Sequence, residues 1–350
     1  MKRKQNNLLG IFRFSIFLTV ILAGLTFWQL SWQGLWLFFV LLILEVTFSF
    51  DNAVVNSRTL ASMSLIWQRI FLTVGIFIAV FAVRFLLPIV IVIFASGLNF
   101  GEVVSMALNN PERYSHVLHN ASPMINAFGG IFLLMIGLSY FVDYNKQIHW
   151  VRGVEPWLAR AGKFENFRAC LILLVMVILY FTVEEKYKAM ILISSVLGTL
   201  LHIGLELFGS LFGSHSSKDI KLKTGWAAFA AFLYLEVLDA SFSFDGVIGA
   251  FAITSSVILI TSGLSAGAIW VRSLTIYLMR SGTLSKYRYL EHGAHWAIVA
   301  LGVMMLFKLF HVELPEWITG SLGLAFIILA IGSSVIEARH AKNTKNLQSS

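Results

Sequence analysis

The segment FSFDNAV (residues 48–54) recurs later in the chain as FSFDGVI (residues 242–248). In each copy an acidic residue stands six positions before the aspartate, Glu45 in the first and Asp239 in the second. Further downstream, IWQR (residues 66–69) matches IWVR (residues 269–272). Because these features recur in the same order in a chain that is poor in charge, they indicate an internal repeat rather than a chance recurrence of Phe and Ser.

The composition around these motifs is that of a membrane protein. Of the 350 residues, 58% are hydrophobic and 13% are charged, against about 25% charged in an average soluble chain. So few charges cannot cover a water-soluble globule, which excludes a soluble enzyme, a disordered chain and a disulfide-stapled secreted domain. The single cysteine, Cys170, also excludes an intrachain disulfide and a dithiol relay. The sequence therefore predicts an all-α, polytopic membrane helix bundle.

About ten segments are long and apolar enough to cross a membrane, since a spanning helix needs about 20 mostly apolar residues. The first follows a basic start that resembles a signal peptide, but its apolar run is too long and lacks a small-residue cleavage site, so we expect a retained helix. The predicted spans are residues 9–30, 34–55, 69–95, 124–143, 168–183, 188–212, 226–251, 257–279, 294–311 and 317–337.

The basic residues are distributed unevenly between the two sides of this predicted topology. Twenty of the 26 Lys and Arg residues fall on the side of both termini, whereas the opposite side holds Arg113, Lys186 and Lys188. By the positive-inside rule, both termini are predicted to be cytoplasmic in a multi-pass protein of the inner (plasma) membrane. The pI near 9.6 then reflects topology, and no nucleic-acid partner is expected.

The two motif copies are predicted to insert in opposite directions. The first copy uses spans two to four and the second uses spans seven to nine, so that five spans separate corresponding helices. An odd separation inverts the second copy, as in many secondary transporters, whose binding sites lie near mid-membrane between the repeats. The expected fold is thus a bundle with two inverted three-helix repeats. Its predicted parts are an N-terminal transmembrane helix (1–33), the first repeat (34–143), an interfacial linker with two transmembrane helices (144–225), the second repeat (226–312), and a last helix with a cytoplasmic tail (313–350).

Five acidic residues lie inside or at the ends of the apolar spans. An ionised side chain near the bilayer centre costs about 2.5–3.5 kcal/mol on insertion scales, so these residues must face the protein interior and be paired, protonated or bound to a cation. They are Glu45, Asp51, Glu236, Asp239 and Asp245.

Helical spacing predicts how these acids are presented. Glu45, Ser49 and Asn52 share one face of a helix, and Asp239 and Ser243 occupy the matching face in the second copy. A continuous helix would point each motif aspartate elsewhere. We therefore expect both helices to break near the motif aspartates, with Gly246 favouring the second break, so that all acids face one cavity.

The chemistry of this cavity suits a hard divalent cation. Carboxylate, amide, hydroxyl and carbonyl oxygens favour Mg²⁺, Ca²⁺ or Mn²⁺ over thiophilic metals. Arg84 and Arg272, both predicted mid-span, are candidate counter-ions; alternatively they neutralise the acids as structural ion pairs that bind no ligand. The predicted ligands are Glu45, Asp51, Asn52, Glu236, Asp239 and Asp245, supported by Ser49, Ser243, Arg84 and Arg272.

The motifs around Asp51 and Asp245 resemble those of TerC-type integral membrane proteins, and of the DUF475 subgroup in particular, over residues 34–312. The resemblance implies export of divalent metal, chiefly Mn²⁺, and a link to tellurium resistance. It carries the family's motif positions to Glu45, Asp51, Asn52, Asp239 and Asp245. The chain departs from a symmetric pattern at Gly246, which stands where the first copy has Asn52 and removes one amide ligand.

The leading functional hypothesis is a secondary transporter that exports a divalent cation, driven by a proton or ion gradient. No nucleotide-binding or hydrolase motif is present, so no enzymatic activity and no resident cofactor are expected. The alternatives are a membrane enzyme or lipid-processing protein that uses the paired acids, and a non-catalytic scaffold for envelope stress or tellurium resistance. His202 and Glu206, one turn apart, are interpreted as an interior hydrogen-bonded pair, and His292 and His295 as a polar helix start. Partners beyond the lipid bilayer and the metal ion are not indicated, and a homo-oligomer is left open.

Overall fold

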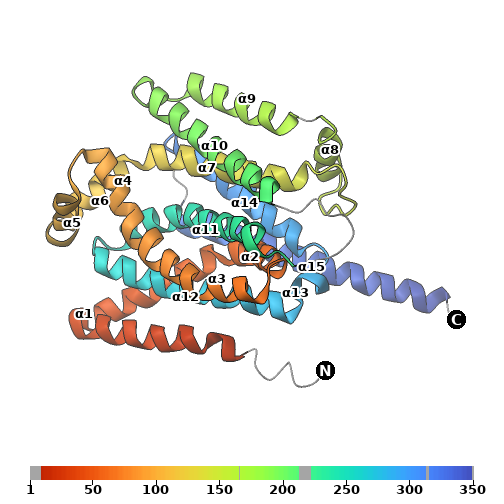
Figure 1. Ribbon diagram of the computed structural model, residues 1–350, viewed down its shortest axis with the longest axis horizontal. Helices are drawn as coiled ribbons and strands as arrows, with labels where there is room; N and C mark the ends of the chain where they lie inside the picture. The colour runs from red at the N-terminus through yellow and green to blue at the C-terminus, as the bar shows by residue number, and fades with distance from the viewer. Residues whose placement is uncertain (1–8, 165, 213–221, 313–314, 349–350) are drawn as a thin grey trace.

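The computed structural model describes residues 9–164, 166–212, 222–312 and 315–348, and these form a bundle of helices without a named strand (Figure 1). Within the described residues, eight helices are long and apolar enough to cross a membrane. The all-α, multi-pass membrane bundle predicted from composition is confirmed. The inverted relation of the two copies and the predicted domain boundaries stay predictions.

The first long helix, α1 (Arg13–Phe48), folds back on itself at Ser31, whose φ of 55° is left-handed. The Ser15 hydroxyl donates to the carbonyl of Ile269 at 3.3 Å, and a Cβ placed on Gly267 would lie 2.5 Å from Cβ of Glu45. A straight helix would separate positions 15 and 45 by about 45 Å, yet both contact the same turn of α12 (Val257–Ser281). The predicted spans 9–30 and 34–55 are therefore two antiparallel arms of α1 (Figure 1).

The remaining helices follow the predicted order. The two arms of α1, the other seven long helices and the shorter α9 account for the ten predicted segments. A nine-residue π-helix, η3, interrupts the third segment. The bounds are η2 (Leu9–Phe12), α2 (Phe50–Ala61), α3 (Leu65–Phe77), η3 (Ile78–Leu86), α4 (Leu87–Ser96), α5 (Phe100–Asn109), α6 (Pro111–Asn120), α7 (Ser122–Phe141), α8 (Val154–Ala161), α9 (Phe167–Thr182), η4 (Glu185–Tyr187), α10 (Lys188–Phe212), α11 (Gly225–Ile253), α13 (Thr283–Lys286), α14 (Leu290–Lys308) and α15 (Glu316–Gln348).

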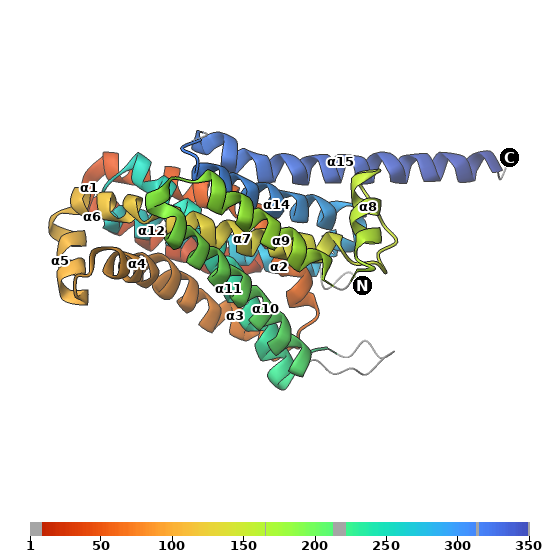
Figure 2. The same ribbon diagram turned by 90° about the horizontal axis from the view of Figure 1, so that it is seen from above.

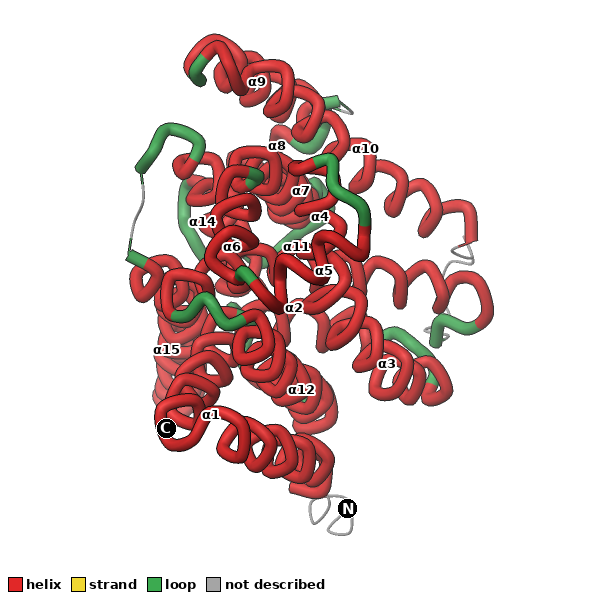
Figure 3. Tube along the Cα trace, turned by 90° about the vertical axis from the view of Figure 1, so that its left-hand side faces the viewer, coloured by secondary structure: helices red, strands yellow, loops and turns green. Residues whose placement is uncertain are grey.

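The start of α1 and the end of α15 lie toward one end of the bundle, and the turn of α1 lies with α5 and α6 at the other (Figure 1). The last part of α15 extends past its neighbours toward the C-terminus (Figure 2). Viewed along the bundle, α1 and α9 lie on opposite flanks with α2 near the centre (Figure 3). The placement of the termini relative to the membrane stays a prediction.

The short helix α2 forms the centre of the fold. It contacts α11, α12, α14 and α15, and every residue from 51 to 57 is buried. The helix is interrupted at Ser49, between the end of α1 and the start of α2. The helix break predicted near Asp51 is therefore confirmed.

The second predicted break is wrong, because α11 runs as one helix through residues 244 and 245. Gly246 instead allows two helices to approach each other, since a Cβ there would lie 3.3 Å from Oε2 of Glu45. The matched IWQR and IWVR motifs also differ in their surroundings, because Arg69 is exposed whereas Arg272 is buried.

We predict that Gly267→Ala destabilises the protein. The added Cβ would meet the side chain of Glu45 at 2.5 Å and force α1 away from α12. Overpacking of this kind costs about 1–3 kcal/mol, which lowers the thermal unfolding temperature of the protein in detergent. Gly332→Ala in α15 is the matched control because no atom lies within 4 Å of its Cβ position. Equal unfolding temperatures for the two variants would contradict the close packing of α1 on α12.

Candidate functional site

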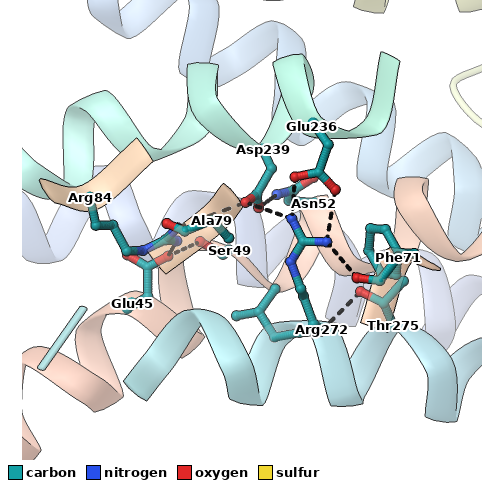
Figure 4. Close-up of polar contacts among 11 residues, drawn as sticks. Glu45, Ser49, Asn52, Phe71, Ala79, Arg84, Glu236, Asp239, Arg272 and Thr275 are labelled. Atoms are coloured by element: carbon teal, nitrogen blue, oxygen red, sulfur yellow. Dashed lines mark hydrogen bonds and ion pairs between the residues drawn. The ribbon is translucent and has the colours of Figure 1, made fainter. Parts of the chain in front are cut away.

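Two buried arginines organise the polar centre of the membrane bundle (Figure 4). Arg84 lies on the π-helix η3, and Arg272 lies on α12. π-Helices are rare and occur frequently at functional sites. The side chains of Arg84 and Arg272 both extend toward Asp239 on α11 (Figure 4).

Arg84 binds the first motif copy. Its guanidinium donates to the carboxylate of Glu45 and, at 3.0 Å, to the carbonyl of Ala79 in its own π-helix. The Ser49 hydroxyl donates to Oε1 of Glu45 at 3.1 Å, which holds the carboxylate at the break between α1 and α2. Arg84 also approaches Oδ2 of Asp239 at 3.8 Å, which links it to the second copy.

Arg272 binds the second copy. Its two terminal nitrogens donate to the two oxygens of Glu236 at 2.9 and 2.7 Å, a bidentate pair that fixes both planes. Arg272 also donates to the carbonyl of Phe71 at 3.1 Å and lies over the ring of that residue. Gly75 leaves room for the pair, because a Cβ there would lie 2.4 Å from the guanidinium.

Asp239 joins the two arginines. Its Oδ2 lies 3.5 Å from Arg272 and 3.8 Å from Arg84, and its Oδ1 accepts a hydrogen bond from the side-chain amide of Asn52 at 2.9 Å. The acids of the two copies therefore meet in one buried network. Arg84 and Arg272 lie within ion-pair distance of these acids.

Asp51 stands apart from this network. It is 3% exposed, its Oδ1 has no hydrogen-bond partner, and no described cation pairs with it. Its carboxyl faces α15 at Gly323, where a Cβ would lie 3.4 Å away. We predicted that Asp51 lies in one cavity with Glu45 and Asp239, but in the structure its side chain forms no hydrogen bond or ion pair with either of them.

Several acceptor and hydroxyl oxygens near the motifs also lack partners. The side-chain carbonyls of Asn52 and Asn56 on α2 and the hydroxyl of Ser243 on α11 are buried without hydrogen bonds. Asn56 was not among the predicted residues, although its position four residues after Asn52 places it on the same face. The side chain of Asp245 lies outside those that the structure describes.

The charges in this region do not balance. Three buried carboxyl groups, those of Glu45, Glu236 and Asp239, share two guanidinium groups, and the buried carboxyl of Asp51 has no described cation. Full ionisation would therefore leave two uncompensated negative charges among the described side chains. An unpaired buried carboxylate costs several kcal/mol. The region therefore needs protons or a cation to balance it.

The predicted metal ligands are not gathered around one point. Among the described residues, no group of three or more His, Cys, Asp and Glu side chains is arranged to hold a metal ion. The two arginines occupy the positions between the acids, an arrangement that the structural ion-pair alternative also anticipates.

The weaker histidine signals lie outside this network. His202 bonds Ser139 at 3.0 Å and lies 3.9 Å from Glu206, whose main partner is Arg168 at 3.2 Å. The predicted interior hydrogen-bonded pair of His202 and Glu206 is therefore wrong, because the two side chains lie beyond hydrogen-bond distance and Glu206 is half-exposed.

Comparison with known proteins gives one result. A family model described as "Protein of unknown function (DUF475)" matches residues 50–341, more than four fifths of the chain. No curated protein and no solved structure matches. The match supports the DUF475 part of the resemblance and leaves the TerC part without support.

We predict that the ion pair between Arg272 and Glu236 matters for stability chiefly as a matched pair. Arg272→Met should lower the free energy of unfolding by about 3–5 kcal/mol, because Glu236 and Asp239 lose their common cation. Adding Glu236→Gln should recover a large part of that loss. The control is Arg288→Met, which removes a half-exposed pair with Glu337 at 2.7 Å and should cost less than about 1 kcal/mol. A double variant as unstable as Arg272→Met would contradict the proposed charge balance.

Proposed function

The chain belongs to the DUF475 family, and we propose that it is a secondary transporter that exchanges a divalent metal cation for protons across the membrane. The multi-pass helix bundle is compatible with such a transporter. The resemblance to metal exporters suggests Mn²⁺ as the substrate and export as the direction. With both termini in the cytoplasm, as the basic residues indicate, the protein would remove the cation from that compartment.

The observation that carries the proposal is a deficit of two positive charges among the buried acids of the motifs. The network of Glu45, Glu236 and Asp239 with two guanidiniums lacks one positive charge, and the separate carboxyl of Asp51 lacks the other. Four carboxyl groups with two guanidiniums become neutral on binding either two protons or one divalent cation. Two protons and one divalent cation carry the same charge, so either would balance these acids. Exchange of one M²⁺ for two H⁺ follows as the expected stoichiometry.

The arrangement of the arginines suggests how binding of protons and binding of the divalent cation alternate. Glu45 and Asp239 are the acids that Arg84 contacts, and Asn52 presents an unpartnered carbonyl oxygen beside Asp239. A cation that binds these oxygens competes with Arg84 for them. We therefore propose that Arg84 leaves Glu45 when the metal binds.

A second interpretation has a specific observation in its favour. Glu45 and Glu236 each have an arginine partner, as expected for a structural ion-pair network that binds no ligand. Under this interpretation, the excess acids remain protonated at all times and the network only orients the helices. Metal transport distinguishes the two interpretations directly.

We predict that the purified protein in liposomes moves Mn²⁺ across the bilayer in response to a proton gradient, as followed with a metal-sensitive dye. Asp51→Asn and Asp239→Asn should each lower the initial rate at least tenfold, because each removes one of the two excess negative charges. The control is Glu112→Gln, which changes an exposed acid on α6.

The predicted stoichiometry supplies an independent test. Exchange of one Mn²⁺ for two protons carries no net charge, so clamping the membrane potential with valinomycin and K⁺ should leave the rate unchanged. Equal transport by wild type and both aspartate variants, at equal amounts of folded protein, would remove the proposal and favour the structural network.

A further inference from the structure

A second polar region lies at the end of the bundle that holds both termini. It is a cavity of about 670 Å³ between α2, α7, α11, α14 and the segment of residues 142–153. Two histidines from α14, His292 and His295, line it. Neither belongs to the buried arginine network, and the proposed transport mechanism does not use them.

The ring of His292 is held in one orientation by a buried carboxylate. Glu155, which is 1% exposed on α8, accepts hydrogen bonds from Nε1 of Trp296 at 2.9 Å and from the backbone amide of Trp150 at 2.8 Å. Its Oε2 lies 2.8 Å from Nδ1 of His292. These hydrogen bonds lower the pKa of Glu155 against the opposing effect of its burial. An ionised carboxylate can only accept, so Nδ1 of His292 carries the proton.

The ring of His295 is fixed in a similar way. Its Nδ1 lies 2.8 Å from the backbone carbonyl of Glu291, and a carbonyl can only accept. The ring stacks on Tyr140 with centroids 3.6 Å apart and planes 9° apart, which prevents it from rotating. Nδ1 of His295 therefore also carries the proton.

On both imidazoles, Nε2 is available to bind a ligand. Neither Nε2 makes a hydrogen bond with a described residue, and on a neutral ring this nitrogen carries the lone pair. Residues three apart on a helix share a face, so the two rings border the same cavity. A histidine whose Nδ1–H is held by a carboxylate or a backbone carbonyl, with Nε2 free, has the arrangement that metal-ligating histidines almost always show.

The charges around the cavity are compatible with a bound cation. Arg58 pairs with Glu291, and Arg288 pairs with Glu337, so these two guanidiniums are neutralised. Nζ of Lys146 lies 3.0 Å from the centroid of the Tyr140 ring, on which His295 stacks. Asp143 adds a carboxylate at the exposed side.

We propose that His292 and His295 form a binding site for one borderline transition-metal cation, of the class of Zn²⁺, Ni²⁺ or Cu²⁺, with water at the remaining positions. Imidazole nitrogens suit these metals, whereas the carboxylate and amide oxygens of the buried network suit harder ions. The site is thus separate from the proposed transport site in position and in metal preference.

The test uses the full-length protein in detergent, with any affinity tag removed, and Cu²⁺ as the probe. The chain offers a matched control pair, His116 and His119, which are also three apart but exposed on α6. In the background His116→Gln/His119→Gln, the electron paramagnetic resonance spectrum of one bound Cu²⁺ should show coupling to two imidazole nitrogens. The further change His295→Gln should reduce the number of coupled nitrogens to one and weaken binding at least tenfold.

Two more variants separate the possible explanations. Glu155→Gln should weaken Cu²⁺ binding about 10–100-fold, because the partner that orients His292 is lost. Asp51→Asn should leave binding unchanged, which distinguishes this site from the transport site. The proposal is overturned if the background protein shows no nitrogen coupling, or if His295→Gln, still folded by its thermal unfolding, binds Cu²⁺ as tightly as the background.

Discussion

The structure depends on one constraint: ionised groups inside a membrane bundle must be balanced where they lie. Asp239 meets this constraint by contacting two guanidiniums at once, with Asn52 on its other oxygen. Through these contacts the side chain connects η3, α12 and α2 to α11. Any helix that shifts relative to the others must therefore change the charge balance, which couples packing to electrostatics in the centre of the protein.

Close helix packing is what allows these short side chains to meet. Gly267 lets α1 approach α12 so closely that Glu45 reaches Arg84, and Gly75 lets the backbone of α3 contact the pair of Arg272 and Glu236. In membranes, small residues serve this role because helices there associate largely through van der Waals packing and polar contacts. The glycines are consequently as much a part of the site as the charged residues.

Much of this could be predicted from the sequence, because a charge in an apolar span is visible against its surroundings. The acids of both motifs and their counter-ions Arg84 and Arg272 were identified in this way. The continuity of α11 was not, because Gly246 favours both a break and a close contact, and only the neighbouring helix decides between them. The reversal at Ser31 falls in the gap between the predicted spans 9–30 and 34–55, whereas the π-helix η3 arises from tertiary packing and no local pattern marks it.

The π-helix η3 couples the position of Arg84 to the orientation of the helix that follows it, α4. Arg84 donates to the carbonyl of Ala79, five residues earlier, on a coil that is wider than an α-helix. Rewinding these nine residues to ordinary α-helical pitch would lengthen the segment and turn α4 about its own axis. The contact of the Arg84 guanidinium with Glu45 and the rotation of α4 about its axis are therefore coupled, because both depend on the winding of η3.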